Sequence, residues 1–118
     1  MTFNRGMVII FKTSKLERVL NSERLIIKRY GPRRSELIKR RLYELKAATV
    51  LEDLRNIPQL RCHELKGNRK EQLSVDLDHP YRLIFEPADN PAPRKDDAGL
   101  DWTKITAIKI IGVEDTHE

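Results

Sequence analysis

The chain has 118 residues, of which 39% are hydrophobic and 35% charged, with a formal net charge of +5 at pH 7. These values predict one folded, soluble domain over residues 1–118, with residues 1–6 as a possible N-terminal extension, and they exclude a disordered chain. The single cysteine, Cys62, excludes an intramolecular disulfide, and no apolar run approaches the roughly 20 residues of a membrane-spanning helix. The pattern is typical of a cytoplasmic protein, and its positive charge favours a polyanionic or an acidic protein partner.

The N-terminal half predicts one strand followed by two helices. Residues 8–11, VIIF, form a β-branched run that is typical of a buried strand. A helix beginning at Thr13 or Ser14 is interrupted near residues 21–22 and resumes until the Gly31-Pro32 pair breaks it. The next helix has a proline in its first turn, and its apolar residues recur three or four positions apart: Leu37, Ile38, Leu42, Leu45 and Ala48.

The C-terminal half changes to the two-residue period of strands. Residues 72–85 predict a hairpin, because apolar and polar residues alternate in LSVDL and a DHP turn leads into YRLIF. Residues 86–101 hold three prolines and five acidic residues, which is typical of a mobile loop, and KITAIKIIGV predicts a last strand. The order β-α-α-β-β-β therefore predicts an α+β domain with two helices on one mostly antiparallel sheet.

Two basic segments are candidates for holding phosphates. Residues 24–46 carry nine basic residues against two glutamates, which fits either a solvated helix face or a phosphate-binding surface that includes Arg40 and Arg41. In HELKGNRK, residues 63–70, Gly67 and Asn68 predict a tight turn with Lys66, Arg69 and Lys70 around it. A basic turn of this kind is more often a solvated loop than a binding site.

The third feature is EDTH, residues 114–117, close to the C-terminus. Asp115 and His117 lie two apart, so they share one face if the last strand extends that far, and the carboxylate can then orient the histidine. A polar terminus without function is the alternative.

Together these features predict a site at the end of the sheet. If the strand ends meet, the candidate residues line one basic surface: His63, Asp115, His117, Lys66, Arg69 and Arg82. Such a set can cleave RNA without a metal, because one group takes the 2′-hydroxyl proton, another protonates the leaving 5′-oxygen, and cations stabilise the phosphate. The three scattered histidines and one cysteine do not form a zinc motif.

The segments LEDLR, RCHELKGNRKEQLSVDLDHPYRLIF and the closing EDTH resemble the HigB branch of the RelE/ParE toxin superfamily, from Met7 onward. The resemblance implies a compact α+β toxin of a type II toxin-antitoxin module, a ribosome-dependent mRNA endoribonuclease that needs no cofactor. It implies a helix-turn-helix antitoxin as partner, with operator DNA contacted only through that antitoxin.

By this resemblance His63, Asp115 and His117 are the catalytic candidates, and Lys66, Arg69 and Arg82 hold the RNA phosphate. The chain departs from the family at Thr116, where a tyrosine is usual. Two alternatives therefore stay open beside the toxin: a relative that binds antitoxin or RNA without cutting, and a ParE-like inhibitor of DNA gyrase.

Overall fold

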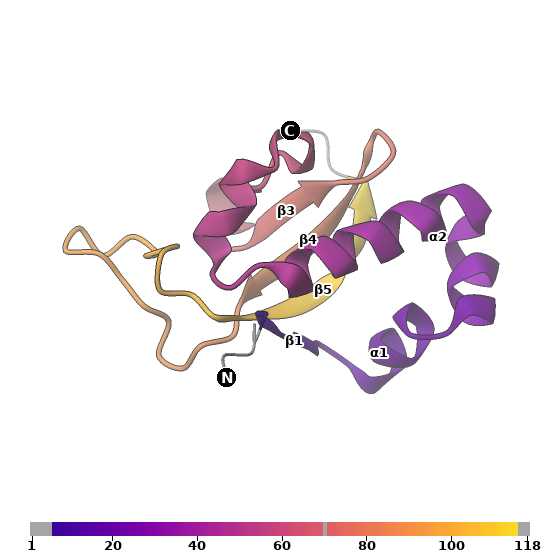
Figure 1. The fold of residues 1–118 in the computed structure, drawn as a ribbon, viewed down its shortest axis with the longest axis horizontal. Helices are drawn as coiled ribbons and strands as arrows, with labels where there is room; N and C mark the ends of the chain where they lie inside the picture. The colour runs from indigo at the N-terminus through magenta and orange to yellow at the C-terminus, as the bar shows by residue number, and fades with distance from the viewer. Residues whose placement is uncertain (1–5, 70, 116–118) are drawn as a thin grey trace, which may run out of the picture.

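The computed structural model describes residues 6–69 and 71–115 and shows helices packed on one face of a sheet (Figure 1). The elements in chain order are β1 (Val8–Phe11), α1 (Ser14–Leu20), α2 (Glu23–Ala47), the 3-10 helices η1 (Leu51–Asn56) and η2 (Pro58–Leu60), β2 (His63–Glu64), the 3-10 helix η3 (Gly67–Arg69), β3 (Leu73–Asp76), β4 (Tyr81–Pro87) and β5 (Ala107–Asp115). The five strands form one sheet in the order β1-β5-β4-β3-β2. β1 pairs with β5 in parallel, and the other three pairs are antiparallel. The predicted α+β class is confirmed, with β2 as an additional short strand.

Local side-chain chemistry sets the helix boundaries. The Thr13 hydroxyl accepts a hydrogen bond from the Leu16 amide at 3.1 Å and caps α1, and the Ser22 hydroxyl does the same for Leu25 at the start of α2. Gly31 has φ 82° and ψ 162°, which are not helical, so α2 is kinked immediately before the proline that follows. The predicted break at Gly31-Pro32 is thus confirmed as a kink inside one continuous element.

The core lies between the helices and one face of the sheet. Ile26, Ile38 and Leu45 of α2 are fully buried and belong to the same apolar cluster as Leu73 and Phe85 of the hairpin. Figure 1 shows α2 running across the front of β4 and β5. Because side chains alternate along a strand, the residues between these core positions point to the opposite face, which we call the open face.

The open face is partly covered by the segment between β2 and β3. Arg69 of this segment forms an ion pair with Glu114 on β5, two strands away from β3 in the sheet. Ser74 and Ile84, on the open face, are fully buried, and Leu65 is 3% exposed. The charged stretch after β2 is therefore packed against the sheet, and only part of it faces the solvent.

Hydrogen bonds and one isolated β-bridge hold parts of the long loop after β4. It extends away from the sheet at the left of Figure 1, and an isolated bridge joins Arg94 to Leu100. The Asp89 carboxylate accepts hydrogen bonds from the Thr106 amide, the Thr106 hydroxyl and the Ala107 amide, at 2.7 to 3.1 Å. Mobility of residues 86–101 stays a prediction, now with specific contacts that oppose it. No helix within the described ranges has both the length and the apolar character to cross a membrane.

Candidate functional site

The strand register gathers charged side chains on the open face. His63 pairs with Ser74 across β2 and β3, Asp76 pairs with Arg82, and Arg82 pairs with Glu114. Directly opposite residues of antiparallel strands have their side chains on the same face of the sheet. One histidine, one arginine and two carboxylates therefore lie on the side of the sheet away from the helices.

A pocket of about 610 Å³ opens among these residues, lined by Arg61, His63, Lys66, Gly67 and Arg82. The structure thus brings together three of the predicted site residues and adds Arg61, which the sequence analysis did not select. The sequence signal that could have identified Arg61 is its basic side chain, which lies two positions before His63. Three cations beside one imidazole make this pocket suited to an anion.

A contact with a backbone carbonyl indicates which nitrogen of the His63 ring carries the hydrogen. Its Nδ1 lies 2.8 Å from the carbonyl oxygen of Arg61, a residue that ends η2 in the left-handed conformation with φ 47°. A carbonyl oxygen only accepts hydrogen bonds, so Nδ1 carries the hydrogen. The lone pair of the neutral ring is then on Nε2, which can accept a proton.

Arg82 and Asp76 form a partly buried charged pair at the side of the pocket. Arg82 Nε lies 3.5 Å from Asp76 Oδ1, and Arg61 Nε lies 3.7 Å from Asp76 Oδ2. The Arg82 side chain is only 12% exposed. Its Nη1, like Asp76 Oδ1 and Ser74 Oγ, is buried and has no hydrogen-bond partner within the described part of the chain. A buried donor without a partner is costly.

The Arg69 guanidinium is bonded to side chains of the same protein. Its Nη1 and Nη2 donate to the two carboxylate oxygens of Glu114 at 2.6 and 3.0 Å, and its Nε and Nη2 donate to Gln72 Oε1 at 3.0 and 2.8 Å. This arrangement ties the segment after β2 to β5. The predicted phosphate contact of Arg69 is untested, and it would have to share the guanidinium with Glu114. Glu114 itself was not selected from the sequence.

Arg41 forms its contacts within the protein, and its predicted contact with RNA is untested. The residue is 8% exposed, its Nε donates to the backbone carbonyl of Asp76 at 2.7 Å, and its Nη1 donates to Glu44 at 2.9 Å. β2 pairs only with Leu73 and Ser74, so the edge of β3 at Asp76 is left for Arg41. A guanidinium bonded in this way would have to leave these partners to contact RNA. Arg40 is exposed, but it belongs to the helix layer on the other side of the sheet from His63.

The C-terminal candidates are only partly described. Asp115 is exposed at the end of β5 and pairs with Tyr81, so its side chain points away from the face that holds Arg82 and Glu114. The catalytic role of Asp115 stays a prediction, and this register does not place it beside His63. His117, Thr116 and Lys70 lie outside the described residues.

Cys62, one position before His63, is not a reactive thiol. Burial raises its pKa to about 12, and the charges of Arg55 and Glu64 act on it in opposite directions. The thiolate, which is the nucleophilic form, is therefore scarce at neutral pH. Within the described residues, no group of three or more histidine, cysteine, aspartate or glutamate side chains is arranged to hold a metal ion.

Comparison with known proteins assigns the family. One solved structure, the toxin-antitoxin complex RelBE2 from Mycobacterium tuberculosis, is 18% identical over 94% of this chain and 99% of the matched chain, with a TM-score of 0.43. That likeness is too distant to support a functional argument, and no curated protein matches. The sequence pattern of HigB-like toxins, described as the RelE-like toxin of the type II toxin-antitoxin system HigB, matches residues 9–95. This match covers most of the chain, from β1 through β4, and the chain belongs to the family of HigB-like toxins.

Proposed function

We propose that this toxin is a ribosome-dependent mRNA endoribonuclease that cleaves without a metal. The observation that carries the proposal is the pocket on the open face, where His63 lies among Arg61, Lys66 and Arg82. An imidazole with an accepting Nε2 supplies a base, and three cations supply the environment for a phosphodiester. Membership in the family of HigB-like toxins supports RNA as the substrate of this reaction.

In this mechanism His63 Nε2 takes the proton of the 2′-hydroxyl. The 2′-oxygen attacks the adjacent phosphorus, and the bond from phosphorus to the 5′-oxygen breaks, which leaves a 2′,3′-cyclic phosphate. His117, oriented by Asp115, gives its proton to the leaving 5′-oxygen. Lys66 and Arg82 stabilise the charge that develops on the phosphate oxygens.

Four further basic residues have supporting roles in the proposal. We assign Arg69 and Lys70 to the surface that holds the RNA phosphate, and Arg61 lines the pocket next to Asp76. Arg40 is exposed on the helix layer, where it suits a peripheral contact with ribosomal RNA, remote from the cleaved bond.

The proposed partners follow from the family and the charge. The chain acts on mRNA in the cytoplasm at the ribosome, and a cognate helix-turn-helix antitoxin neutralises it. The net charge of +5 favours association with ribosomal RNA and with an acidic antitoxin surface. Operator DNA is contacted by the antitoxin.

The test is expression from a tightly controlled promoter in a bacterium, followed by mapping of transcript 5′ ends. Growth arrest with new ends inside translated frames is expected for the wild type, and both effects should be absent in His63→Ala and in His117→Ala. The control is His79→Ala, because His79 is an exposed histidine in the turn between β3 and β4. Normal growth and intact transcripts with abundant folded protein would overturn the proposal in favour of a binding role. Arrest with intact transcripts and altered DNA supercoiling would point to gyrase.

A further inference from the structure

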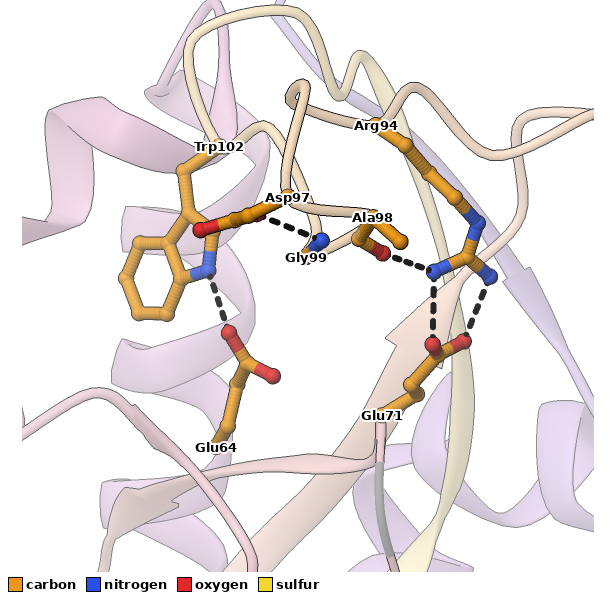
Figure 2. Close-up of polar contacts among 7 residues, drawn as sticks. All are labelled: Glu64, Glu71, Arg94, Asp97, Ala98, Gly99 and Trp102. Atoms are coloured by element: carbon orange, nitrogen blue, oxygen red, sulfur yellow. Dashed lines mark hydrogen bonds and ion pairs between the residues drawn. The ribbon is translucent and has the colours of Figure 1, made fainter.

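The long loop after β4 contacts the segment that carries the candidate site at two points. We call residues 88–104 the strap and residues 63–72 the site segment. The Trp102 indole Nε1 donates to Glu64 Oε2 at 3.1 Å, and the Arg94 guanidinium donates through both terminal nitrogens to Glu71, at 2.6 and 2.9 Å. Figure 2 shows both contacts, with the two glutamates beneath the strap. Glu64 directly follows His63, and Glu71 directly precedes Gln72, so the strap contacts the segment at both ends.

The strap has internal hydrogen bonds that fix its own shape. Arg94 Nη1 also donates to the carbonyl oxygen of Ala98 at 3.0 Å, and the Gly99 amide donates to the Asp97 carboxylate at 2.8 Å (Figure 2). Backbone bonds from Lys95 to Gly99 and from Asp101 to Pro93 close the turn. A loop stabilised in this way can hold another segment in place.

Trp102 connects the strap to the core. Its side chain lies against the apolar cluster and is 5% exposed, and the Arg55 guanidinium stacks on its ring at 3.8 Å. The hydrogen bond to Glu64 therefore starts from a side chain that is already ordered by packing and by a cation–π contact.

The site segment has little regular structure to hold it. β2 is two residues long and pairs only with β3, at the edge of the sheet. Gly67 and Glu71 have positive φ values of 69° and 73°, and for a glutamate that conformation is unfavourable unless its surroundings impose it. The two hydrogen bonds from the Arg94 guanidinium to the Glu71 carboxylate stabilise the site segment at this strained residue.

We propose that the strap positions the candidate site, with Arg94 and Trp102 as positioning residues that act through Glu71 and Glu64 on His63 and Lys66. The inference rests on the proposed function and explains the long acidic, proline-rich loop as part of the site. Side chains that act on a phosphodiester must be held within a fraction of an ångström, and a misplacement of about 1 Å can lower the rate by about a hundredfold.

Two substitutions each remove one of the two contacts between the strap and the site segment. Trp102→Phe keeps an aromatic ring against Arg55 and loses the indole donor to Glu64. Arg94→Gln removes both hydrogen bonds to Glu71 and also the hydrogen bond to the Ala98 carbonyl within the strap. Lys95→Gln is the matched control, because Lys95 is on the same strap and forms an ion pair with Asp97 at 3.8 Å, within the strap.

The first measurement is amide hydrogen exchange in residues 63–72 of the purified protein without RNA. Exchange should be about tenfold faster in both variants and unchanged in the control, because local opening follows the loss of local contacts. The exchanged pair, Glu71→Arg with Arg94→Glu, should recover protection relative to Arg94→Gln. Wild-type exchange rates in both single variants would overturn the role of the strap.

The second measurement separates positioning from binding on programmed ribosomes. The maximal single-turnover cleavage rate should fall about tenfold in the variants while the ribosome affinity changes less than twofold. Equal cleavage rates in the variants and the wild type would also overturn the proposal. If the wild type cleaves nothing, the proposed function fails, and the exchange measurement still decides whether the strap holds the segment.

Discussion

His63 Nδ1 donates to the carbonyl oxygen of Arg61 at 2.8 Å, and the left-handed conformation of Arg61 turns the chain into β2. The contact is made within three consecutive residues, so local backbone geometry helps to orient the ring. It leaves Nε2 as the accepting nitrogen of the neutral ring. The same local turn thus brings Arg61 and His63 to the same pocket.

The first prediction concerns His63 as the base. His63→Ala should lower the cleavage rate by about a hundredfold to ten-thousandfold, the usual range for loss of a general acid or base. The free energy of unfolding should change little, because the side chain is half-buried and outside the apolar cluster. Single-turnover cleavage on ribosomes and urea unfolding measure the two quantities. A variant that cleaves at the wild-type rate would assign the base to another residue.

The second prediction concerns the charge balance of the pocket. Asp76 lies within 3.7 Å of Arg61 and 3.5 Å of Arg82 and offsets part of their charge. Arg82→Gln should weaken RNA binding roughly tenfold to a hundredfold, because it removes a charged donor. Asp76→Asn should strengthen binding and steepen its dependence on salt, because both guanidinium groups are then free of the carboxylate.

Fluorescence titration of a short RNA at several salt concentrations measures these effects. Lys109→Gln is a suitable control, because Lys109 pairs with Glu86 on the β4–β5 ladder, away from the pocket residues. Equal affinities for the wild type, Asp76→Asn and Arg82→Gln would show that the phosphate is bound elsewhere.

Much of the fold follows from periodicity in the sequence. The alternation of Leu73 and Val75 with polar residues gives the hairpin, and the Gly31-Pro32 pair gives the kink in α2. β2 was not predicted because two residues are too short to show a period. Its existence depends on pairing with β3, a contact that only the folded chain supplies.

The candidate site was predictable where one local motif contains it. His63 and Lys66 lie in one short motif, and they do line one pocket with Arg82. The face of Asp115 was not predictable, because it depends on the register of β5 against β4 and on the irregularity beside Ile84 and Phe85. The pairing of Arg69 with Glu114, 45 residues apart, depends on how the chain crosses the sheet.

The third prediction separates two adjacent arginines of α2. Arg41 lies three positions after Ile38 and four before Leu45, so helical periodicity places it on the buried stripe. Arg41→Gln should lower the free energy of unfolding by about 1–3 kcal/mol, since it leaves the Asp76 carbonyl and Glu44 without a charged donor. Arg40→Gln, one position away and exposed, should stay within about 0.5 kcal/mol.

Urea unfolding measures the free energy of unfolding of both variants, and a ribosome-binding assay measures their affinity for the ribosome. Arg40→Gln should weaken binding and lessen its salt dependence, while folded Arg41→Gln should bind normally. If Arg41→Gln were as stable as the wild type and bound ribosomes poorly, its buried position would have to change on binding.

The last prediction concerns acid stability and the link between α2 and the turn after β3. Arg34 Nε donates to Asp78 at 2.9 Å, and its guanidinium stacks on Tyr81 with 3.5 Å to the ring centre. The hydrogen bond from Arg34 lowers the pKa of Asp78 below the ordinary value of 3.8 for an aspartate. A carboxylate with a lowered folded-state pKa stabilises the protein above its unfolded-state pKa, and this contribution is lost as pH falls through the folded-state value.

Asp78→Asn should therefore lower the free energy of unfolding by about 1 kcal/mol at pH 7, a modest value because solvent reaches part of the pair. The difference from the wild type should shrink as pH falls below 3.8 and vanish once the Asp78 carboxylate of the folded protein is protonated. Urea unfolding at several pH values measures it. Asp96→Asn is the control, because Asp96 is exposed in the long loop and has no ion pair with any described residue. A difference between Asp78→Asn and the wild type that stays constant as pH falls below 3.8 would show that the lost contribution is packing of the turn, because a charge contribution must decrease as the carboxylate takes up a proton.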